Sequence, residues 1–363
     1  MIRLLLSGLS ADRVELNLAR ALRDSGIELF VVDNPESPAA EWCRSENIPH
    51  ADHEFHNRFE LQAISLYRDL FRRREFDVVH CLTNRALSTA LLATRRFNRR
   101  PKIVAYRGTM GHLHRWDPAS LLSYLNPRVD CIVCVSDAVR RYLKEFKIPD
   151  SRLEVVWKGH DPSWYSPAPR SALAEFGIPS DAVVAGFVGN VRPVKGVDVL
   201  LRAFDEVSPL ENLHLLLVGE VRDPHVQKEI GRHPNVHFLG FRPDAAHLAG
   251  ACDVAVMPSV EREGLPKAIL EAMAQGIPPV VSNVGGLPEL VVDGSCGFVV
   301  PPRDPAALLV ALRRLAADAP LRRSFGAAAR ARIVGPFNIR HTVQKTVALY
   351  RRLLNLPPDA PNQ

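Results

Sequence analysis

The sequence predicts an α/β protein built from two similar halves, each a parallel sheet with helices on both faces. Short apolar, β-branched runs alternate with segments of helical period along almost the whole chain. A stretch rich in proline and aromatic residues, 157–171, breaks this alternation, which then restarts. The chain has 363 residues, which is too long for one ordinary hydrophobic core. We therefore expect two Rossmann-like domains whose sheets face each other across a cleft.

The first half opens with an apolar strand at 2–7 and a helix at 13–26, for which Gly26 is a suitable C-cap. The other strands expected in this half are the apolar runs 27–33, 77–82, 102–106, 130–136 and 153–157. The stretch 157–171 is interpreted as a linker. The N-terminal domain is accordingly placed at 1–160.

In the second half, each expected strand has a helical segment beside it. These strands are 182–190, 213–220, 235–240, 252–259, 278–283 and 296–302. A second domain is placed at 161–340. The remainder, 341–363, is expected to form a C-terminal helix followed by a flexible tail that is rich in proline.

Composition excludes several classes of protein. No apolar run approaches the roughly 18 residues of a membrane span, and the first apolar stretch is too short for a signal peptide. A cytoplasmic location is expected. Among the six cysteines, Cys131 and Cys134 have CxxC spacing but lie in an expected strand, where positions three apart face opposite sides. We therefore expect reduced core thiols and no metal site.

The net charge of +6 is unevenly distributed. Seven Arg or Lys and no acid occur between Arg95 and Arg115. We call the group Arg95, Arg96, Arg99, Arg100 and Lys102 the basic cluster. It fits an anionic membrane surface or an anionic acceptor, and the alternative is a solvated helix end. Nucleic acid is not expected as a partner, because no aromatic stacking platform accompanies the charge.

The junctions after the strands are the places to look for a ligand, because parallel α/β sheets bind ligands beyond the carboxyl ends of their strands. Neither half contains GxGxxG or a P-loop. The second half instead has "GFVGNVRPVKG", in which Gly189 follows a strand and Lys195 precedes a helix. Glycine lets a backbone approach a phosphate, and lysine adds a positive charge.

A second junction, "EREGLPKAILEAMA", opens a helix with Pro266 near its first position. The amides of Gly264, Leu265 and Lys267 can cradle a phosphate there. Glu271, about one turn into the helix and set among apolar residues, can accept hydrogen bonds from two adjacent hydroxyls, as on a ribose. Glu263 would then project toward the group beyond the phosphates.

These two junctions resemble those of retaining glycosyltransferases of family 4, which have the two-domain fold called GT-B. The resemblance covers roughly 180–305 and, more faintly, the N-terminal half. The Glu-x7-Glu motif of that family maps onto Glu263 and Glu271. The resemblance implies that Glu271 holds the nucleotide ribose, that Glu263 contacts the donor sugar near its reacting carbon, and that Lys195 neutralises the diphosphate.

The chain departs from the family pattern at three places. Asn190 stands where many relatives have an arginine after the strand, and Arg192, two residues on, is the candidate replacement. Arg107 stands where many relatives have a histidine, so Arg107, His112 and His114 are the acceptor-side candidates. The loop 7–15 lacks the double glycine common in relatives.

The expected reaction is transfer of a sugar from a nucleoside-diphosphate sugar to an acceptor hydroxyl. A lipid-linked or other cell-envelope glycan, such as lipopolysaccharide or another polysaccharide, is the expected acceptor, on the cytoplasmic face of a membrane. No DxD occurs in the sequence, so neither a metal ion nor another cofactor is expected. Two alternatives remain open: a nucleotide-sugar 2-epimerase of the same fold, which needs no acceptor, and a non-catalytic subunit that binds nucleotide sugars.

Overall fold

The computed structural model describes residues 1–9, 13–97, 99–208 and 210–358. The chain divides into two compact units. The N-terminal unit comprises residues 1–158 and 339–363, and the C-terminal unit comprises residues 159–338. The last five residues of the expected tail, 359–363, and residues 10–12 of the loop without a double glycine lie outside the described residues.

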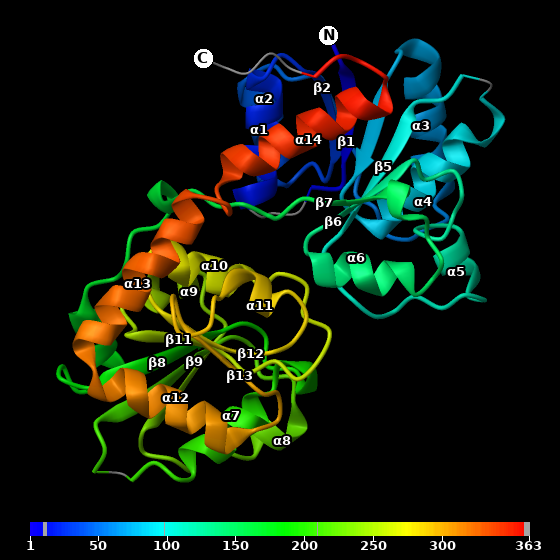
Figure 1. The fold of residues 1–363 in the computed structure, drawn as a ribbon. Helices are drawn as coiled ribbons and strands as arrows, with labels where there is room; N and C mark the ends of the chain where they lie inside the picture. The colour runs from blue at the N-terminus through cyan, green and yellow to red at the C-terminus, as the bar shows by residue number, and fades with distance from the viewer. Residues whose placement is uncertain (10–12, 98, 209, 359–363) are drawn as a thin grey trace. The chain divides into compact units, whose positions relative to one another are not determined.

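The N-terminal unit contains a seven-stranded sheet in the order β3-β2-β1-β4-β5-β6-β7, and every strand pair is parallel (Figure 1). Its strands are β1 (Arg3–Ser7), β2 (Glu28–Asp33), β3 (His50–Asp52), β4 (Val78–Cys81), β5 (Lys102–Arg107), β6 (Cys131–Cys134) and β7 (Leu153–Val155). Its helices are α1 (Arg13–Asp24), α2 (Pro38–Ser45), α3 (Leu61–Arg73), α4 (Asn84–Ala93), α5 (Pro118–Leu121), α6 (Asp137–Lys144) and α14 (Ile339–Leu353). Short 3-10 turns are η1 (Thr94–Arg96) and η2 (Asp150–Arg152).

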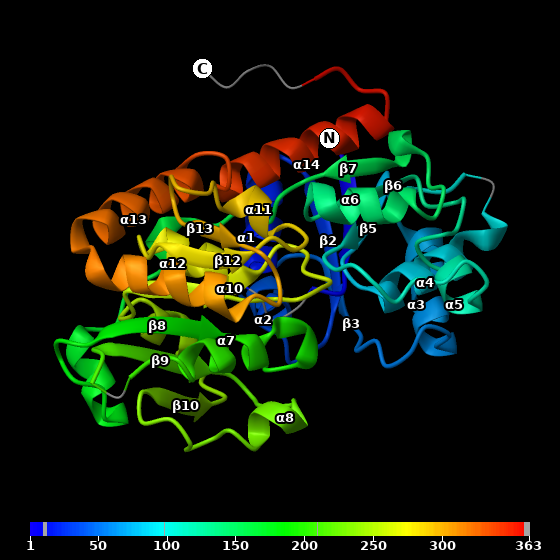
Figure 2. The same cartoon turned by 60° about the horizontal axis from the view of Figure 1, so that its bottom comes forward.

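Helices cover both faces of this sheet. Helices α1 and α14 lie side by side on one face, and α3 and α4 pack together on the other (Figures 1 and 2). The central strand β1 is apolar on both sides, and Leu4, Leu5 and Leu6 are fully buried. This continuous apolar run is typical of parallel strands that are covered on both faces.

Local sequence explains where the helices begin and end. Helix α1 ends just before Gly26, whose φ of 81° is a left-handed conformation that glycine adopts without strain. A hydroxyl side chain accepts a hydrogen bond from the first turn of three helices: Ser37 at α2, Thr83 at α4 and Ser136 at α6. The positive φ of Gly26 after the end of α1 confirms the C-cap that the sequence predicted.

The C-terminal unit contains a six-stranded parallel sheet in the order β10-β9-β8-β11-β12-β13. Its strands are β8 (Val183–Val188), β9 (Leu213–Val218), β10 (Val236–Gly240), β11 (Val254–Met257), β12 (Pro279–Ser282) and β13 (Phe298–Val300). Its helices are α7 (Val197–Phe204), α8 (Pro224–Gln227), α9 (Ala245–Ala249), α10 (Lys267–Ala274), α11 (Leu287–Leu290), α12 (Pro305–Ala317) and α13 (Ala319–Val334), and its 3-10 turns are η3 (Pro162–Trp164), η4 (Arg170–Phe176) and η5 (Pro193–Lys195).

This sheet too is covered on both faces. Helices α7 and α12 pack together on one face, and α9, α10 and α13 lie on the other (Figure 1). The strand order reverses between β8 and β11, just as it reverses between β1 and β4 in the N-terminal unit. Such switch points are where open α/β sheets hold their ligands.

Two features of the N-terminal unit differ from the sequence interpretation. Strand β3 was not expected, because its three residues, "HAD", form no apolar run. The segment 341–363, set apart as a C-terminal helix and tail, is grouped with the N-terminal unit.

Within this unit, Tyr350 of α14 and His80 of β4 are both buried and share a hydrogen bond of 2.7 Å. Burial lowers the pKa of His80 to about 3, so the imidazole is neutral.

The cysteines behave as core residues. All six are free and buried. Burial raises the pKa of both Cys131 and Cys134 to about 12, so neither is a reactive thiolate. This confirms the expectation of reduced core thiols. Among the described helices, none is both long enough and apolar enough to cross a bilayer.

Candidate functional site

In the C-terminal unit, the loop after β8 is held against the loop after β9 through two glycines. Gly189 has a φ of 148°, and a Cβ on Gly219 would lie 2.1 Å from the carbonyl oxygen of Gly189. Only glycine allows so close an approach of the two backbones. The chain then passes the exposed side chains of Asn190 and Arg192 and enters η5, which carries Lys195.

The loop after β8 also contacts the loop after β11. The amide of Val260 donates a hydrogen bond of 2.9 Å to the carbonyl of Val194. Gly196 has a φ of 66°, and a Cβ there would lie 2.1 Å from the carbonyl oxygen of Pro258. The contact between these loops brings Lys195 and Glu263, which are 68 positions apart in the sequence, together at the switch point between β8 and β11.

Lys195 and Glu263 form an ion pair at this contact. The Lys195 Nζ lies 2.8 Å from Oε2 of Glu263, and the two side chains are only 14% and 11% exposed. The Ser259 hydroxyl donates a second hydrogen bond, 2.7 Å long, to the same oxygen. The pair therefore places a cation and a carboxylate together in a poorly solvated position.

The segment between Glu263 and α10 contains two backbone amides that have no hydrogen-bond acceptor among the described residues. Gly264 and Leu265 are buried, and no acceptor in the described part of the chain contacts either amide. Buried amides in proteins are almost always hydrogen bonded, so these two fit a ligand. Helix α10 begins at Lys267. Pro266, expected near the first helical position, lies one residue before the helix and has an extended ψ of 121°.

Glu271 lies one turn into α10 among fully buried neighbours, and its side chain is 10% exposed. Lys267, whose side chain is 47% exposed, places its Nζ 3.4 Å from Glu271 Oε1. Glu271 therefore has a cation beside it, from the preceding turn of this apolar helix. The predicted role of Glu271 toward a ribose stays a prediction.

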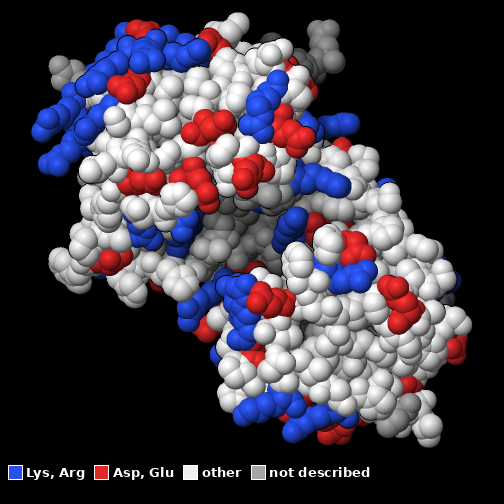
Figure 3. Space-filling view, turned by 180° about the vertical axis from the view of Figure 1, so that it is seen from behind, with Lys and Arg blue, Asp and Glu red and all other residues white. Residues whose placement is uncertain are grey.

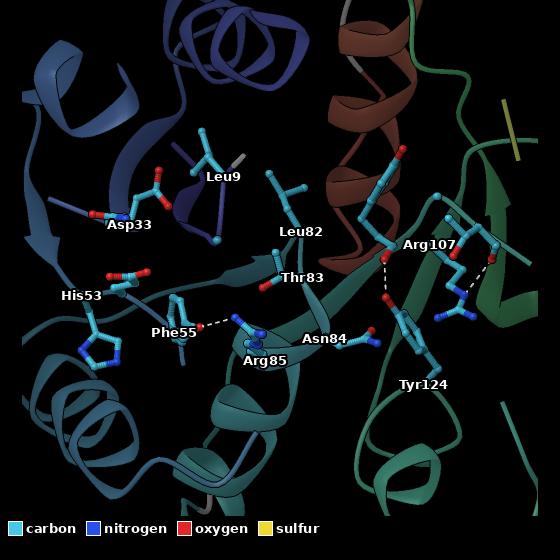
Figure 4. Close-up of a pocket in the computed structure, with 16 residues that line it drawn as sticks. Leu9, Asp33, His53, Phe55, Leu82, Thr83, Asn84, Arg85, Arg107 and Tyr124 are labelled. Carbon is cyan, nitrogen blue, oxygen red and sulfur yellow. Dashed lines mark hydrogen bonds between the residues drawn. The ribbon is translucent and has the colours of Figure 1, made fainter. Parts of the chain in front are cut away.

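The N-terminal unit has a cavity of about 520 Å³ at the carboxyl ends of its strands. It is lined by residues that follow β1, β2, β4 and β5, which places it at the switch point between β1 and β4. Figure 4 shows Asp33 and His53 at one end of this cavity and Arg107 and Tyr124 at the other. Burial raises the pKa of Asp33 to about 6, against a hydrogen bond from Ser37 of 2.7 Å that favours the charged form.

The three acceptor-side candidates lie in different environments. Arg107, the last residue of β5, is buried and lines the cavity. His112 and His114 are exposed in the loop that follows β5, and neither lines the cavity. The structure thus brings only Arg107 of the three to this cavity.

Sequence reasoning missed most of the other polar residues that line the cavity, among them Asp33, His53, Thr83, Asn84 and Arg85. A signal was available for four of them, because Asp33 ends an apolar strand run and the other three directly follow one at 77–82. His53 had no such signal, since it follows the unexpected strand β3.

Comparison with known proteins gives matches in both units. The family "Glycosyltransferase Family 4" matches residues 11–164, and "Glycosyl transferases group 1" matches residues 182–318. The solved structure of Anabaena Alr3699/HepE in complex with UDP superposes with a TM-score of 0.79 at 21% identity, covering 98% of this chain and 100% of that one. The chain therefore has the GT-B fold, with a glycosyltransferase domain in each unit.

Two curated relatives are similar in sequence. D-inositol 3-phosphate glycosyltransferase of Corynebacterium glutamicum (strain R) is 35% identical over 188 residues, which is 47% of this chain and 44% of the relative. N-acetyl-alpha-D-glucosaminyl L-malate synthase of Bacillus anthracis is 26% identical over 307 residues, which is 82% of this chain and 80% of the relative. The chain thus matches less than half the length of the first of these relatives.

Proposed function

We propose that this chain transfers a sugar from a nucleoside-diphosphate sugar to an acceptor hydroxyl, with retention at the anomeric carbon. The observation that carries the proposal is the Lys195–Glu263 pair next to the amides of Gly264 and Leu265, which are unpaired among the described residues. A cation beside free amides fits a diphosphate. The UDP bound to a protein of the same fold supports a nucleotide donor.

Each residue of this site then has a role in the transfer. The diphosphate lies on the amides of Gly264 and Leu265, and Lys195 and Arg192 stabilise the charge that develops as it leaves. Glu263 lies near the anomeric carbon, where a carboxylate stabilises positive charge in an oxocarbenium-like transition state. In this proposal, Lys195 and Arg192 take the place of a divalent metal ion. Turnover should therefore persist in EDTA, and measuring it there tests the proposal directly.

Glu271→Ala is expected to weaken donor binding about ten- to a hundredfold, because a hydrogen bond to a charged group contributes roughly 1.5–3 kcal/mol. The donor is first chosen as the nucleotide sugar that most raises the melting temperature of the wild type. A ligand at 100 times its Kd stabilises the fold by about 2.7 kcal/mol. Titration calorimetry with that donor then gives the affinity of each variant.

Glu261→Ala is the matched control for this variant. Glu261 is a neighbouring acid whose side chain is 44% exposed, and among the described residues its ion-pair partner is Arg262, at 3.2 Å. Its removal should leave donor affinity within twofold of the wild type. A folded Glu271→Ala variant with wild-type donor affinity would remove Glu271 from the donor site.

We also propose that the acceptor belongs to a cell-envelope glycan and that the basic cluster holds the enzyme on an anionic membrane. Figure 3 shows Lys and Arg side chains gathered on the N-terminal unit. Arg95, Arg96 and Arg99 of the cluster are exposed. Arg100 and Lys102 both pair with Asp130, at 2.6 and 3.5 Å, so three members of the cluster carry the proposal.

The test of membrane attachment is sedimentation with vesicles. Each Arg or Lys near an anionic surface contributes about 1 kcal/mol, so the three exposed arginines should give salt-sensitive binding. The wild type should sediment with vesicles of anionic lipid at low salt, and a variant with Arg95, Arg96 and Arg99 changed to glutamine should not. Equal sedimentation of the two proteins would assign the arginines to the solvated surface.

A further inference from the structure

Arg107 is a buried cation whose bonds leave its charge unmatched. The residue is 4% exposed, its Nε donates to the carbonyl of Thr109 at 2.9 Å, and its Nη2 donates to the carbonyl of Gly111. The guanidinium lies over the ring of Tyr124, 4.7 Å from its centre. No carboxylate among the described residues lies within ion-pair distance of it. A buried charge without an opposite charge is unfavourable, so the site favours an anion.

A second cation lines the same cavity. Arg85 donates from Nη1 to the carbonyl of Phe55 at 2.7 Å and has no carboxylate partner among the described residues. Figure 4 shows Arg85 and Asn84 between the two ends of the cavity. The buried Oδ1 of Asn84 has no hydrogen-bond partner in the described part of the chain. The cavity therefore combines two cations that have no ion-pair partner among the described residues with an amide oxygen that can accept from a hydroxyl.

The other end of the cavity differs in chemistry. Asp33 is there, and Glu54 is a second carboxylate in the lining of the cavity. The raised pKa of Asp33, about 6, means that part of the molecules carry a protonated, hydrogen-bond-donating carboxyl near neutral pH. Carboxyl and amide groups of this kind recognise sugar-like hydroxyls. A volume of about 520 Å³ lies in the range of small-molecule sites, roughly 300–1,000 Å³.

We infer that this cavity binds the acceptor as a compact hydroxylated anion, with its phosphate or carboxylate on Arg107 and its hydroxyls toward Asn84 and Asp33. The inference rests on the proposed transferase function, because it names the acceptor of that reaction. Inositol 3-phosphate and L-malate, which appear in the names of the two relatives, are hydroxylated anions of this class. The anion is either the head group of a membrane lipid, which agrees with the cell-envelope acceptor proposed above, or a free molecule, which would replace that acceptor.

The transfer step balances with this acceptor. The acceptor hydroxyl oxygen forms a bond to the anomeric carbon while the bond between that carbon and the diphosphate oxygen breaks. The bonding electron pair leaves with the diphosphate, which also takes up the hydroxyl proton. No oxidant, reductant or further reactant is needed.

The experiment compares Arg107→Gln with Arg128→Gln, using titration calorimetry with inositol 3-phosphate, L-malate and neutral inositol. Arg128 is a matched control, because it also donates to two backbone carbonyls, at 3.0 and 2.7 Å, yet does not line the cavity. We expect the wild type to bind at least one of the anions and to bind neutral inositol at least tenfold more weakly. Arg107→Gln should lose about ten- to a hundredfold in anion affinity, and Arg128→Gln should stay within twofold.

If the role of Arg107 were purely structural, restoring its charge alone would not restore anion binding. Arg107→Lys keeps the charge but not both carbonyl contacts, so partial recovery of anion binding by this variant supports the inference. Anion binding by a folded Arg107→Gln variant at wild-type strength would overturn it, as would equal binding of inositol and its phosphate.

Two transfer experiments, here called arms, distinguish a free anion from a lipid head group. Sugar transfer to soluble inositol 3-phosphate or L-malate assigns a free acceptor, and transfer only to vesicles that contain phosphatidylinositol assigns a lipid head group. Transfer in neither arm, together with no binding of either anion in calorimetry, overturns the inference. Anion binding together with failure of every nucleotide sugar to bind or turn over refutes the proposed function alone.

Discussion

Glu263→Gln should lower turnover about a hundredfold or more while leaving affinity for the bare nucleoside diphosphate unchanged or higher. The loss follows because a preorganised carboxylate next to the reacting carbon stabilises charge that develops only in the transition state. The unchanged or increased affinity follows from the ion pair. Lys195 is bound to Glu263 at 2.8 Å, so removing the negative charge frees the lysine for a diphosphate. Steady-state kinetics and calorimetry with the nucleoside diphosphate measure the two effects.

Lys195→Ala provides the contrasting result. It should weaken binding of both the nucleotide sugar and the bare nucleoside diphosphate about ten- to a hundredfold. If Glu263→Gln instead weakens nucleoside diphosphate binding as strongly as Lys195→Ala does, Glu263 is part of the phosphate site and its proposed role is wrong. Both variants leave one partner of a poorly solvated pair without its opposite charge, so their assays should be run well below their melting temperatures.

Gly196→Ala should reduce the free energy of unfolding by more than about 3 kcal/mol and should disrupt the donor site. Two effects add here. The φ of 66° is unfavourable for a residue with a Cβ, and that Cβ would lie 2.1 Å from the carbonyl oxygen of Pro258. The two loops that carry Lys195 and Glu263 must then move apart. Urea unfolding gives the stability, and donor titration gives the state of the site.

Gly177→Ala separates these two effects. Gly177 has a similar φ of 75°, but a Cβ there would meet nothing within 4 Å. It should therefore report backbone strain alone, on the order of 1 kcal/mol. Equal losses for the two variants would mean that the contact with Pro258 gives way at little energetic cost.

Much of the fold could be predicted from sequence because the parallel strands are buried on both faces. Such strands form continuous apolar runs, and "RLLLS" and "LHLLLV" became β1 and β9. Strand β3 could not be predicted, because its residues are polar and it forms through backbone pairing with β2, which leaves no apolar run in the sequence. The docking of α14 on the N-terminal unit was also beyond the sequence, since periodicity shows that a helix has an apolar face but not what covers it.

The candidate donor site could be predicted in part. Strand-end loops with glycine, lysine and glutamate were recognisable by their order along the chain. The direct contact between Lys195 and Glu263 was not, because it depends on the loop crossing at Gly196 and Pro258. The same holds for Arg107. Its position in the sequence marked it as a candidate, but that no carboxylate among the described residues pairs with it is a property of the folded unit.

Helix α14 has a consequence for synthesis of the protein. His80 and its partner Tyr350 are 270 positions apart in the sequence, and the C-terminal unit lies between them. At about 5–20 residues per second, a ribosome makes Tyr350 roughly 15–50 seconds after His80. The unit whose synthesis begins second can therefore complete its core first. Until then the part of this sheet face that α14 covers, beside α1, stays exposed on the nascent chain, and it is there that we expect a chaperone to bind during translation.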